Sequence, residues 1–214
     1  MSAAPPEAPR DCRLCPRLVG YREANARAEP AWFNGAAPSF GDANARLLVV
    51  GLAPGRTGAN RTGRPFTGDY AGELLYGTLK KLGLAEGEYR ADPNDGFTLK
   101  DAMITNAVRC APPENKPTPE EIATCRPFLA ARIAALPRVR AILARGSIAH
   151  ESVLRAHGLK PTDAKFGHGA EAALPNGRTL VSSYHCSRYN TQTRRLTTAM
   201  FEAAMARAKA LAIA

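Results

Sequence analysis

The sequence LLVVGLAPGRTGANRTGRPFTGD, residues 47–69, decides the fold. It begins with Leu47–Val50, an apolar run whose length is typical of a strand buried in a sheet. The run ends at Gly51, and a glycine-rich loop continues to Asp69. Loops longer than about 12–15 residues in compact domains are usually functional. We therefore expect a ligand-binding loop at the end of a buried strand.

Strand and helix patterns alternate through the rest of the chain. The segments expected to be strands are Ala102–Val108, Val139–Leu143 and Arg178–Tyr184. The segments expected to be helices are Gly72–Leu82, Thr118–Leu136 with a kink or restart at Pro127, Ser147–Ala156, and a last helix from about Leu196. Strands separated by helices predict an α/β fold on a mainly parallel, four-stranded central sheet.

Polar side chains follow the ends of these strands, where ligands bind in parallel sheets. The glycine loop lacks both the Gly-Lys-Ser/Thr ending of a phosphate-binding loop and the spacing of a dinucleotide fingerprint. Asn106 can offer a donor and an acceptor to a base edge, although a plain turn would also suit asparagine. His185 is expected at the same edge as the glycine loop, which favours a functional over a structural histidine.

The chain has five cysteines, an odd number. Cys12 and Cys15 form a C-x2-C pair, and Cys110 and Cys125 are separated by fourteen residues. Such a set fits a tetrahedral zinc site or an iron–sulfur cluster, and the spacing does not choose between them. Cys186 is left over and is interpreted as a buried free thiol.

The composition is that of a globular protein with an excess of basic residues. Lys and Arg total 29 against 19 Asp and Glu, a net charge of +10, which favours a polyanionic partner, although basic proteins of GC-rich genomes share this feature. No apolar run approaches the ~20 residues of a membrane span, and no signal peptide is visible. We expect a cytoplasmic, monomeric protein with a mobile segment at residues 1–10 and one domain at 11–214.

Together these segments resemble the uracil-DNA glycosylase superfamily, most closely its family 5, the iron–sulfur enzymes called UDGb. The resemblance runs from about Cys12 to Thr198, nearly the whole folded chain. The motifs that carry it are Gly51-Leu52-Ala53-Pro54-Gly55, Asn60–Asp69, Asn106–Cys110, Cys125 and His185–Thr197. Family 4 has an acidic residue soon after the proline of the first motif, and this chain has none there.

The resemblance implies a three-layer α/β/α sandwich and a monofunctional DNA glycosylase of base excision repair. Such an enzyme flips uracil, and with a broad site also hypoxanthine and other deaminated bases, out of double- or single-stranded DNA, and leaves an abasic site. Phe66 would stack on the base, Asn106 would bind its Watson–Crick edge, and His185 would face its O2 atom. The backbone of the first motif would line the pocket through Gly51, Ala53 and Gly55.

Further roles follow from the same resemblance. Cys12, Cys15, Cys110 and Cys125 would hold a structural [4Fe–4S] cluster. Asp69 is the nearest acid that can help activate water, because the first motif lacks a carboxylate or amide. The 185–197 segment would contact DNA, through the residues Arg188, Tyr189, Arg194 and Arg195. The family more often has proline at position 186 and glycine at position 194, so this loop departs from the pattern.

Two other functions stay open. One is a non-catalytic iron–sulfur module that binds nucleic acid with the same fold. The other is a relative that traps uracil covalently on a loop histidine, which carries an Arg/His-rich insertion after its first motif. Arg56–Arg64 contains no histidine, which disfavours the covalent alternative.

Overall fold

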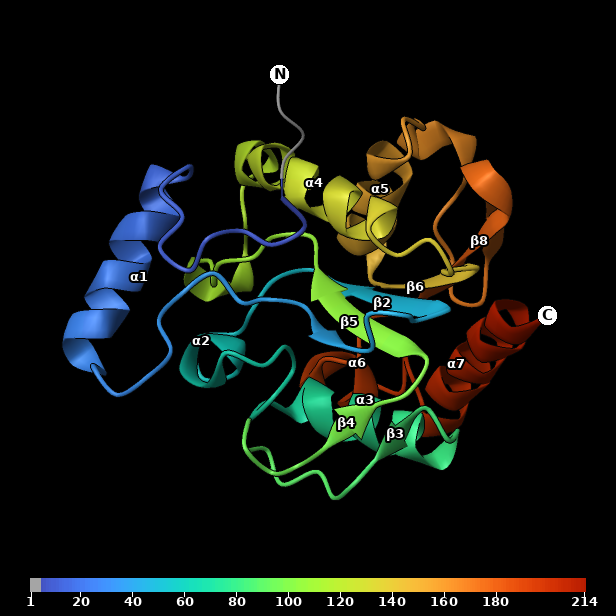
Figure 1. Ribbon diagram of the computed structural model, residues 1–214, viewed down its shortest axis with the longest axis horizontal. Coiled ribbons are helices and arrows are strands. Elements are labelled where there is room, and N and C mark those ends of the chain that lie inside the picture. Colours follow the sequence, from blue (N-terminus) through green and yellow to red (C-terminus); the bar gives the residue numbers. More distant parts are fainter. Residues whose placement is uncertain (1–4) are drawn as a thin grey trace.

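Three layers make up the molecule, as the computed structural model shows (Figure 1). The structure describes residues 5–214, apart from the side chain of Arg188. A central sheet is covered by helices on both faces, with α4 and α5 on one face and α3 and α7 on the other. The α/β/α arrangement expected from the sequence is therefore confirmed.

The main sheet has six strands in the order β1-β5-β2-β6-β8-β7. The four central strands are parallel to one another, and the two edge strands are antiparallel to their neighbours. The strands are β1 Phe40–Gly41, β2 Leu47–Gly51, β5 Ala102–Asn106, β6 Ala141–Arg145, β7 Glu171–Leu174 and β8 Arg178–Ser183. A separate two-stranded sheet pairs β3, Ala85–Glu86, with β4, Thr98–Leu99.

The helices connect these strands across the two faces. They are α1 Pro16–Ala28, α2 Ala59–Thr62, α3 Tyr70–Lys81, α4 Pro119–Ala134, α5 Ser147–Ala156, α6 Arg188–Gln192 and α7 Thr198–Ile213. Three 3-10 turns span Pro113–Asn115, Pro161–Asp163 and Pro175–Gly177. After β2 the chain runs to β5 on one side, and after β5 it crosses to β6 on the other. This reversal creates a crevice at the carboxyl end of β2, where parallel sheets bind ligands.

The alternation of side chains along β2 divides the core into two halves. Leu47 and Val49 pack with α3 and α7 residues such as Leu79 and Phe201. Leu48 and Val50 pack on the opposite face, in the cluster that contains Leu129 of α4 and residues of α5. All four β2 side chains are fully buried, which explains why the strand is continuously apolar.

Some elements differ from those expected. The four expected strands form the parallel centre of the sheet, and the edge strands β1 and β7 complete it. These two strands were not predicted, because two to four residues carry too weak a pattern to be recognised. Helix α1 was not expected, because the segment is mostly polar. Helix α4 continues through Pro127 as one helix, and the capping box between Thr118 and Glu121 starts it as expected.

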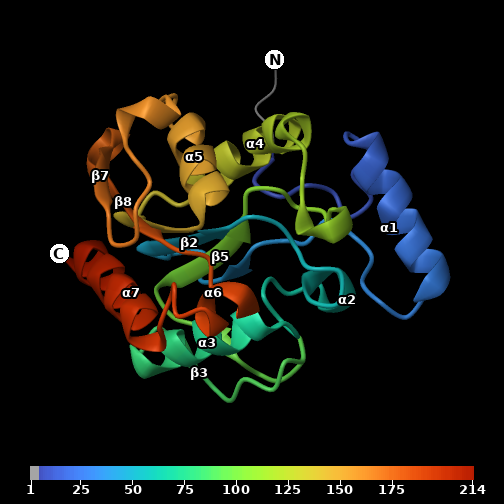
Figure 2. The same cartoon turned by 180° about the vertical axis from the view of Figure 1, so that it is seen from behind.

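Helix α1 stands at the end of the molecule opposite α7 in both views (Figures 1 and 2). In the segment before α1, the Glu7 carboxylate forms ion pairs with Arg109, which follows β5, and with Arg132 of α4. Residues 1–4 of the expected mobile segment lie outside the described residues. Among the described helices, none is long and apolar enough to cross a membrane.

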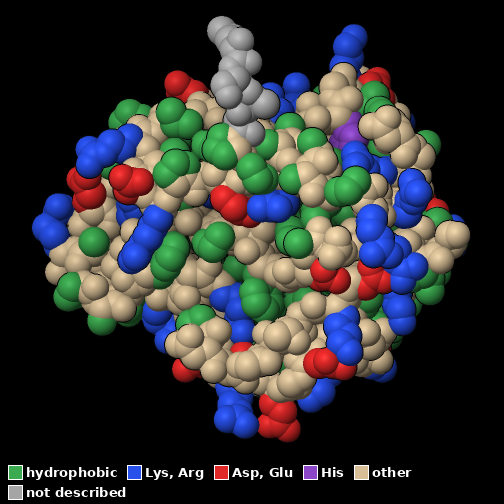
Figure 3. Space-filling view, viewed as in Figure 1, with side chains coloured by type: hydrophobic (Ala, Val, Ile, Leu, Met, Phe, Trp, Pro, Cys, Tyr) green, Lys and Arg blue, Asp and Glu red, His purple; other side chains and the backbone are tan. Residues whose placement is uncertain are grey.

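Lys and Arg side chains are spread over the face of the molecule shown in Figure 3, with Asp and Glu side chains among them. The net charge of +10 is therefore not gathered into one patch on this face. Charge on this face therefore does not mark the functional site.

Candidate active site

A cleft of about 550 Å³ opens at the carboxyl ends of the parallel strands. Its volume lies in the range of small-molecule sites. The residues around it are Tyr21, Leu52, Ala53, Gly55, Arg56, Thr57, Phe66, Asp69, Tyr70, Ala71, Pro112, Glu114, Asn115, His185 and Ser187. The glycine loop after β2 and the segment after β8 thus meet at one cavity, although more than 110 positions separate them in the chain.

Gly51 and Asn106 are paired across neighbouring strands. Neither is among the described residues that line the cleft, but both lie beside Phe66, which does line it. The Asn106 side chain is buried, and its Oδ1 atom has no hydrogen-bond partner among the described residues. A Cβ at position 51 would lie 2.2 Å from Cζ of Phe66 and 2.6 Å from Oδ1 of Asn106. Only glycine therefore leaves room for the ring and the amide together. A buried, unpaired amide oxygen beside an aromatic ring is a ready acceptor for a ligand.

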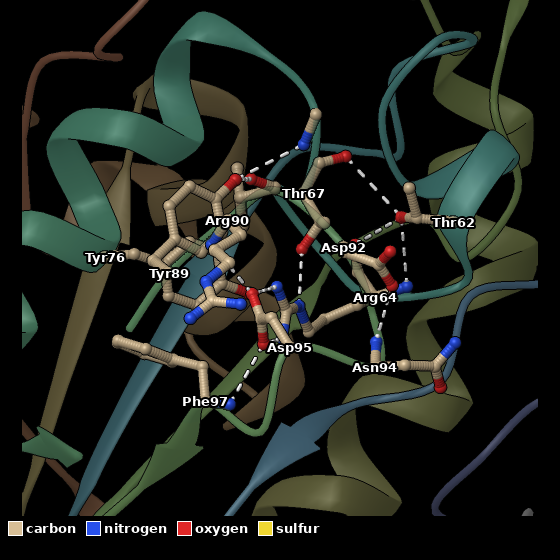
Figure 4. A network of polar contacts seen from close by, with 12 residues as sticks. Thr62, Arg64, Thr67, Tyr76, Tyr89, Arg90, Asp92, Asn94, Asp95 and Phe97 are labelled. Atoms are coloured by element: carbon tan, nitrogen blue, oxygen red, sulfur yellow. Dashed lines mark hydrogen bonds and ion pairs between the residues drawn. The ribbon is translucent and has the colours of Figure 1, made fainter. Parts of the chain in front are cut away.

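Phe66 has a backbone conformation that is rare for an aromatic residue, with a φ of 57°. A network of polar contacts that includes Tyr76 and Tyr89 holds its loop (Figure 4). Tyr89 donates a hydrogen bond from its hydroxyl to the carbonyl of Phe66, and Tyr76 donates to that of Pro65. The backbone at Pro65 and Phe66 is thus anchored by two tyrosine hydroxyls.

The ion pair between Arg64 and Asp95 lies at the centre of this network (Figure 4). Both guanidinium nitrogens of Arg64 donate to Asp95, at 2.7 and 2.8 Å, and its Nε atom donates to Thr67. The Asp95 side chain is fully buried, and that of Arg64 is 4% exposed. The Arg64 guanidinium holds the pKa of Asp95 well below its ordinary value of 3.8.

We expect the substitution Asp95→Asn to lower the free energy of unfolding by about 3–5 kcal/mol at pH 7, because it leaves the Arg64 charge buried without a counter-charge. An Asp with a lowered pKa stabilises the fold above its unfolded value and loses that effect as the pH falls below it. Urea unfolding at pH 7 and pH 3.5 measures both effects. If Asp95→Asn lost as much free energy of unfolding between pH 7 and pH 3.5 as the wild type does, Asp95 would not be the source of that loss.

His185 follows β8 and reaches the cleft beside the end of β6. A Cβ placed on Gly146 would lie 3.6 Å from the Cβ of His185, so the two strand ends are close here. Burial lowers the pKa of His185 to about 4, and the positive charge of Arg145 contributes to the shift. The imidazole is therefore neutral at pH 7 and can donate a hydrogen bond without carrying a charge.

Asp69 caps the start of α3 and also faces the cleft. Its Oδ1 atom accepts a hydrogen bond from the Gly72 amide at 2.8 Å. Its Oδ2 atom faces the glycine loop, because a Cβ on Gly58 would lie 2.9 Å away and one on Gly55 would lie 3.7 Å away. Burial raises the pKa of Asp69, while the Gly72 amide and the Arg145 guanidinium act in the opposite direction. Such a carboxylate is suited to accept a proton.

The segment expected to contact DNA begins at the rim of the cleft, at Ser187. Tyr189 is 70% exposed, and Arg194 and Arg195 are exposed as well. Arg188 begins α6, and its side chain lies outside the described residues. Arg194 has a φ of 56°, a conformation that favours glycine. This agrees with the glycine that the resembling family more often has at that position.

One buried residue of this region was missed in the sequence. Arg145 ends β6, is fully buried, and stacks its guanidinium carbon 4.2 Å from the centre of the Phe66 ring. The strand expected there ended at Leu143, and a single arginine in an arginine-rich segment carries no signal of burial. Only the tertiary structure places this charge behind the cleft.

The four cysteines expected to be ligands line one small, mostly apolar cavity away from the cleft, and are Cys12, Cys15, Cys110 and Cys125. Arg22 donates to the sulfur of Cys110 and the Arg109 amide donates to that of Cys125. Burial raises the pKa of the Cys110 thiol to about 11 and that of Cys125 to about 12. Within residues 5–214, no three Cys, His, Asp or Glu side chains form a group that could hold one metal ion.

A model of the Uracil DNA glycosylase superfamily matches residues 38–209, a range that includes every cleft residue except Tyr21. The chain belongs to this superfamily. Among similar proteins, the type-5 uracil-DNA glycosylase of Thermus thermophilus is 49% identical over 207 residues, which cover 94% of each chain. That of Mycobacterium tuberculosis is 42% identical over 209 residues, covering 94% of this chain and 78% of the relative.

A second group of glycosylases in this superfamily is more distant. The type-4 uracil-DNA glycosylase of Pyrobaculum aerophilum is 33% identical over 150 residues, which cover 70% of this chain and 62% of the relative. The type-5 relatives therefore match more of the chain at higher identity. This confirms the resemblance to family 5 read from the motifs.

Proposed function

We propose that this chain is a monofunctional uracil-DNA glycosylase, a hydrolase that removes uracil from DNA and leaves an abasic site. The single observation that carries the proposal is the buried Oδ1 atom of Asn106, which has no partner among the described residues and lies next to Phe66, a residue that lines the cleft together with His185. The names of the type-5 relatives support it. Among the described residues that line the cleft there is no lysine, so a lyase step through a lysine amine is disfavoured.

We propose the following base-binding roles. Phe66 stacks on the flipped base, and Asn106 binds its Watson–Crick edge. His185 donates a hydrogen bond to O2. The backbone of the first motif lines the pocket at Gly51, Ala53 and Gly55. Gly51 matters most among these, because its missing side chain lets Phe66 and Asn106 meet.

The reaction breaks the bond between C1′ of the sugar and N1 of the base, and the electron pair leaves with the base. Negative charge develops on the base and positive charge on the sugar. His185 stabilises the first as a neutral donor at O2, where burial, together with the charge of Arg145, disfavours a protonated imidazole. A water oxygen then bonds to C1′, and Asp69 positions this water and accepts its proton. Burial, which raises the pKa of Asp69, favours that transfer.

The substrate is DNA that contains a deaminated base, double- or single-stranded, and the enzyme acts as a monomer. Flipping costs a few kcal/mol and is least unfavourable at a mismatch, so uracil opposite guanine is favoured. The 188–195 segment contacts phosphates and the duplex at the rim of the cleft through Arg188, Tyr189, Arg194 and Arg195. Arginine contacts to phosphate position DNA without reading its sequence.

We infer that the substrate range extends beyond uracil to hypoxanthine and other deaminated bases. The loop 52–58 offers neither carboxylate nor side-chain amide to select one base, and the cleft of about 550 Å³ has room for a purine. Duplexes with uracil, hypoxanthine, xanthine and thymine opposite guanine test this range directly. Release of uracil alone would contradict it.

We expect the substitutions His185→Ala and Asp69→Ala each to lower uracil excision about tenfold or more, because each removes a group that acts on developing charge. Alkali cleavage of a labelled duplex with one uracil measures abasic sites. His157→Ala, directly after the end of α5 and away from the cleft, is the matched control and keeps the wild-type rate. A wild-type protein that binds the duplex without forming abasic sites would instead support the non-catalytic iron–sulfur module.

We also propose that Cys12, Cys15, Cys110 and Cys125 hold a [4Fe–4S] cluster. The donor set fits such a group, because four thiols surround one apolar cavity and two N–H donors already face their sulfurs. Each thiolate of a four-iron cluster binds a different iron, so the thiols need not converge on one metal ion. When bound, the cluster ties together the segment before α1, the segment after β5, and α4. Its role is structural, since the cavity is separate from the cleft.

Protein purified without oxygen is expected to be brown, with broad absorption near about 400 nm, and to contain iron and sulfide. The substitution Cys125→Ser should remove most of this absorption and lower the free energy of unfolding. Cys186→Ser is the matched control, because Cys186 lies outside the cavity, and it keeps the absorption. A colourless wild-type protein with stoichiometric zinc would overturn the cluster assignment.

A further inference from the structure

Arg145 differs from the other most deeply buried arginines in having no ion-pair partner. Arg64 and Arg109 are 4% and 1% exposed, and they pair with Asp95 and Glu7. Arg145 is 0% exposed, and among the described residues no carboxylate lies within ion-pair distance of it. A guanidinium that is buried without a counter-charge is expected to destabilise the fold.

The hydrogen bonds of Arg145 do not compensate for this burial. Its Nη2 atom donates to the carbonyl of Ala71 at 3.4 Å and to the sulfur of Cys186. Its Nε and Nη1 atoms have no partner among the described residues. The guanidinium also packs over the Phe201 ring, 5.6 Å from its centre, and the Asp69 charge opposes the effect of burial on its pKa. With no ion pair among the described residues, a role in the cleft is the alternative to a purely stabilising one.

The surroundings of Arg145 point to the cleft. Its guanidinium carbon lies 4.2 Å from the centre of the Phe66 ring, and Phe66 is itself a cleft residue. The charge also acts on two other polar side chains of the site: it adds to the effect of burial in lowering the pKa of His185, and it opposes the effect of burial, which raises the pKa of Asp69. One buried cation thus contacts or influences three groups that face the flipped base.

We propose that Arg145 is a positioning residue for base excision, which holds the Phe66 ring from behind and places a fixed positive charge near the departing base. The proposal rests on the proposed stacking of Phe66 on the base. Arg145 forms no bond and transfers no proton. When the bond from C1′ to N1 breaks, the electron pair moves onto the base, and a cation behind the stacked ring favours that movement more than it favours the bound ground state.

The test compares two leaving groups in the variant Arg145→Met, which keeps the length of the side chain and removes its charge. Fluorine withdraws electrons, so 5-fluorouracil leaves as a more stable anion and needs less help from the protein. We expect the single-turnover rate of uracil excision to fall about 10–30-fold and that of 5-fluorouracil to fall clearly less. The ratio of the 5-fluorouracil rate to the uracil rate therefore rises at least about threefold. Arg145→Lys, which keeps the charge, should restore most of the wild-type ratio.

The free energy of unfolding provides a second readout. If Arg145 were merely structural, replacing it would lower this free energy. Urea unfolding of Arg145→Met should show an unchanged or higher free energy of unfolding, because an uncompensated charge is replaced by an apolar side chain. Arg178→Met is the matched control: Arg178 donates to the carbonyls of Val139, Ile133 and Leu136 away from the cleft. It should lower stability and leave the ratio of rates unchanged.

The outcomes separate this proposal from the proposed function. A wild-type protein that excises neither base overturns the glycosylase itself. If the wild-type protein is active, the role of Arg145 is overturned by an Arg145→Met variant that fails to fold, keeps the wild-type uracil rate, or slows both bases equally. Slower uracil excision with a raised ratio and retained stability supports it.

Discussion

Replacing Asn106 by leucine is expected to lower uracil excision about 10³-fold and to leave the free energy of unfolding unchanged or raised. Leucine has nearly the same shape but offers no hydrogen bond to the base. In the free protein the substitution breaks no hydrogen bond at Oδ1, because that buried atom has no partner among the described residues. Single-turnover excision and urea unfolding measure the two effects on the same protein.

The contrast with Asn60 makes this prediction sharper. Asn60 is 1% exposed, and its Nδ2 atom donates to Oδ1 of Asn34 at 3.0 Å. Asn60→Leu therefore breaks a hydrogen bond that the free protein makes and should cost about 1–3 kcal/mol of stability. If Asn106→Leu is destabilised as strongly as Asn60→Leu, Asn106 serves the fold rather than the base.

The substitution Gly51→Ala is expected to lower kcat/KM at least about 10²-fold and the free energy of unfolding by about 1–3 kcal/mol. The added Cβ would lie 2.2 Å from the Phe66 ring and 2.6 Å from Oδ1 of Asn106, far inside contact distance. The Arg145 guanidinium packs over the face of this ring, so a displaced ring also loses that contact. One methyl group thus displaces both base-binding side chains.

Gly77→Ala is the matched control for this substitution. Gly77 lies within α3, and nothing comes within 4 Å of a Cβ placed there. The change should leave excision as in the wild type and stabilise the protein by about 0.5–1 kcal/mol, because alanine favours the helix. Wild-type kcat/KM in Gly51→Ala would show that the close approach of Phe66 and Asn106 is not needed for binding the base.

The position of Asn106 and His185 at one edge of the sheet could be predicted because strand ends are visible in the sequence. The carboxyl ends of parallel strands meet at the same edge, so residues that follow two apolar runs must lie near one another. The glycine-rich loop marked that edge too. The cysteines could be grouped by residue type, but their convergence on one cavity depends on how α1 and α4 pack.

The support behind Phe66 could not be predicted. The pairing of Arg64 with Asp95 joins two loops, and neither residue differs in the sequence from an arginine or aspartate at the surface. Arg145 likewise stands in an arginine-rich segment. Burial of a charged side chain is a property of the assembled layers, not of local pattern.

The amino-acid sequence alone determined the alternation of strands and helices, the parallel sheet, and the motifs that indicate the superfamily. These depend on apolar periodicity and on residues that are near one another in the chain. The tertiary structure alone decided which charges are buried and what they face, because those contacts join segments far apart in the sequence. The missing partner of Asn106 Oδ1 and the lone cation behind Phe66 belong to this second kind.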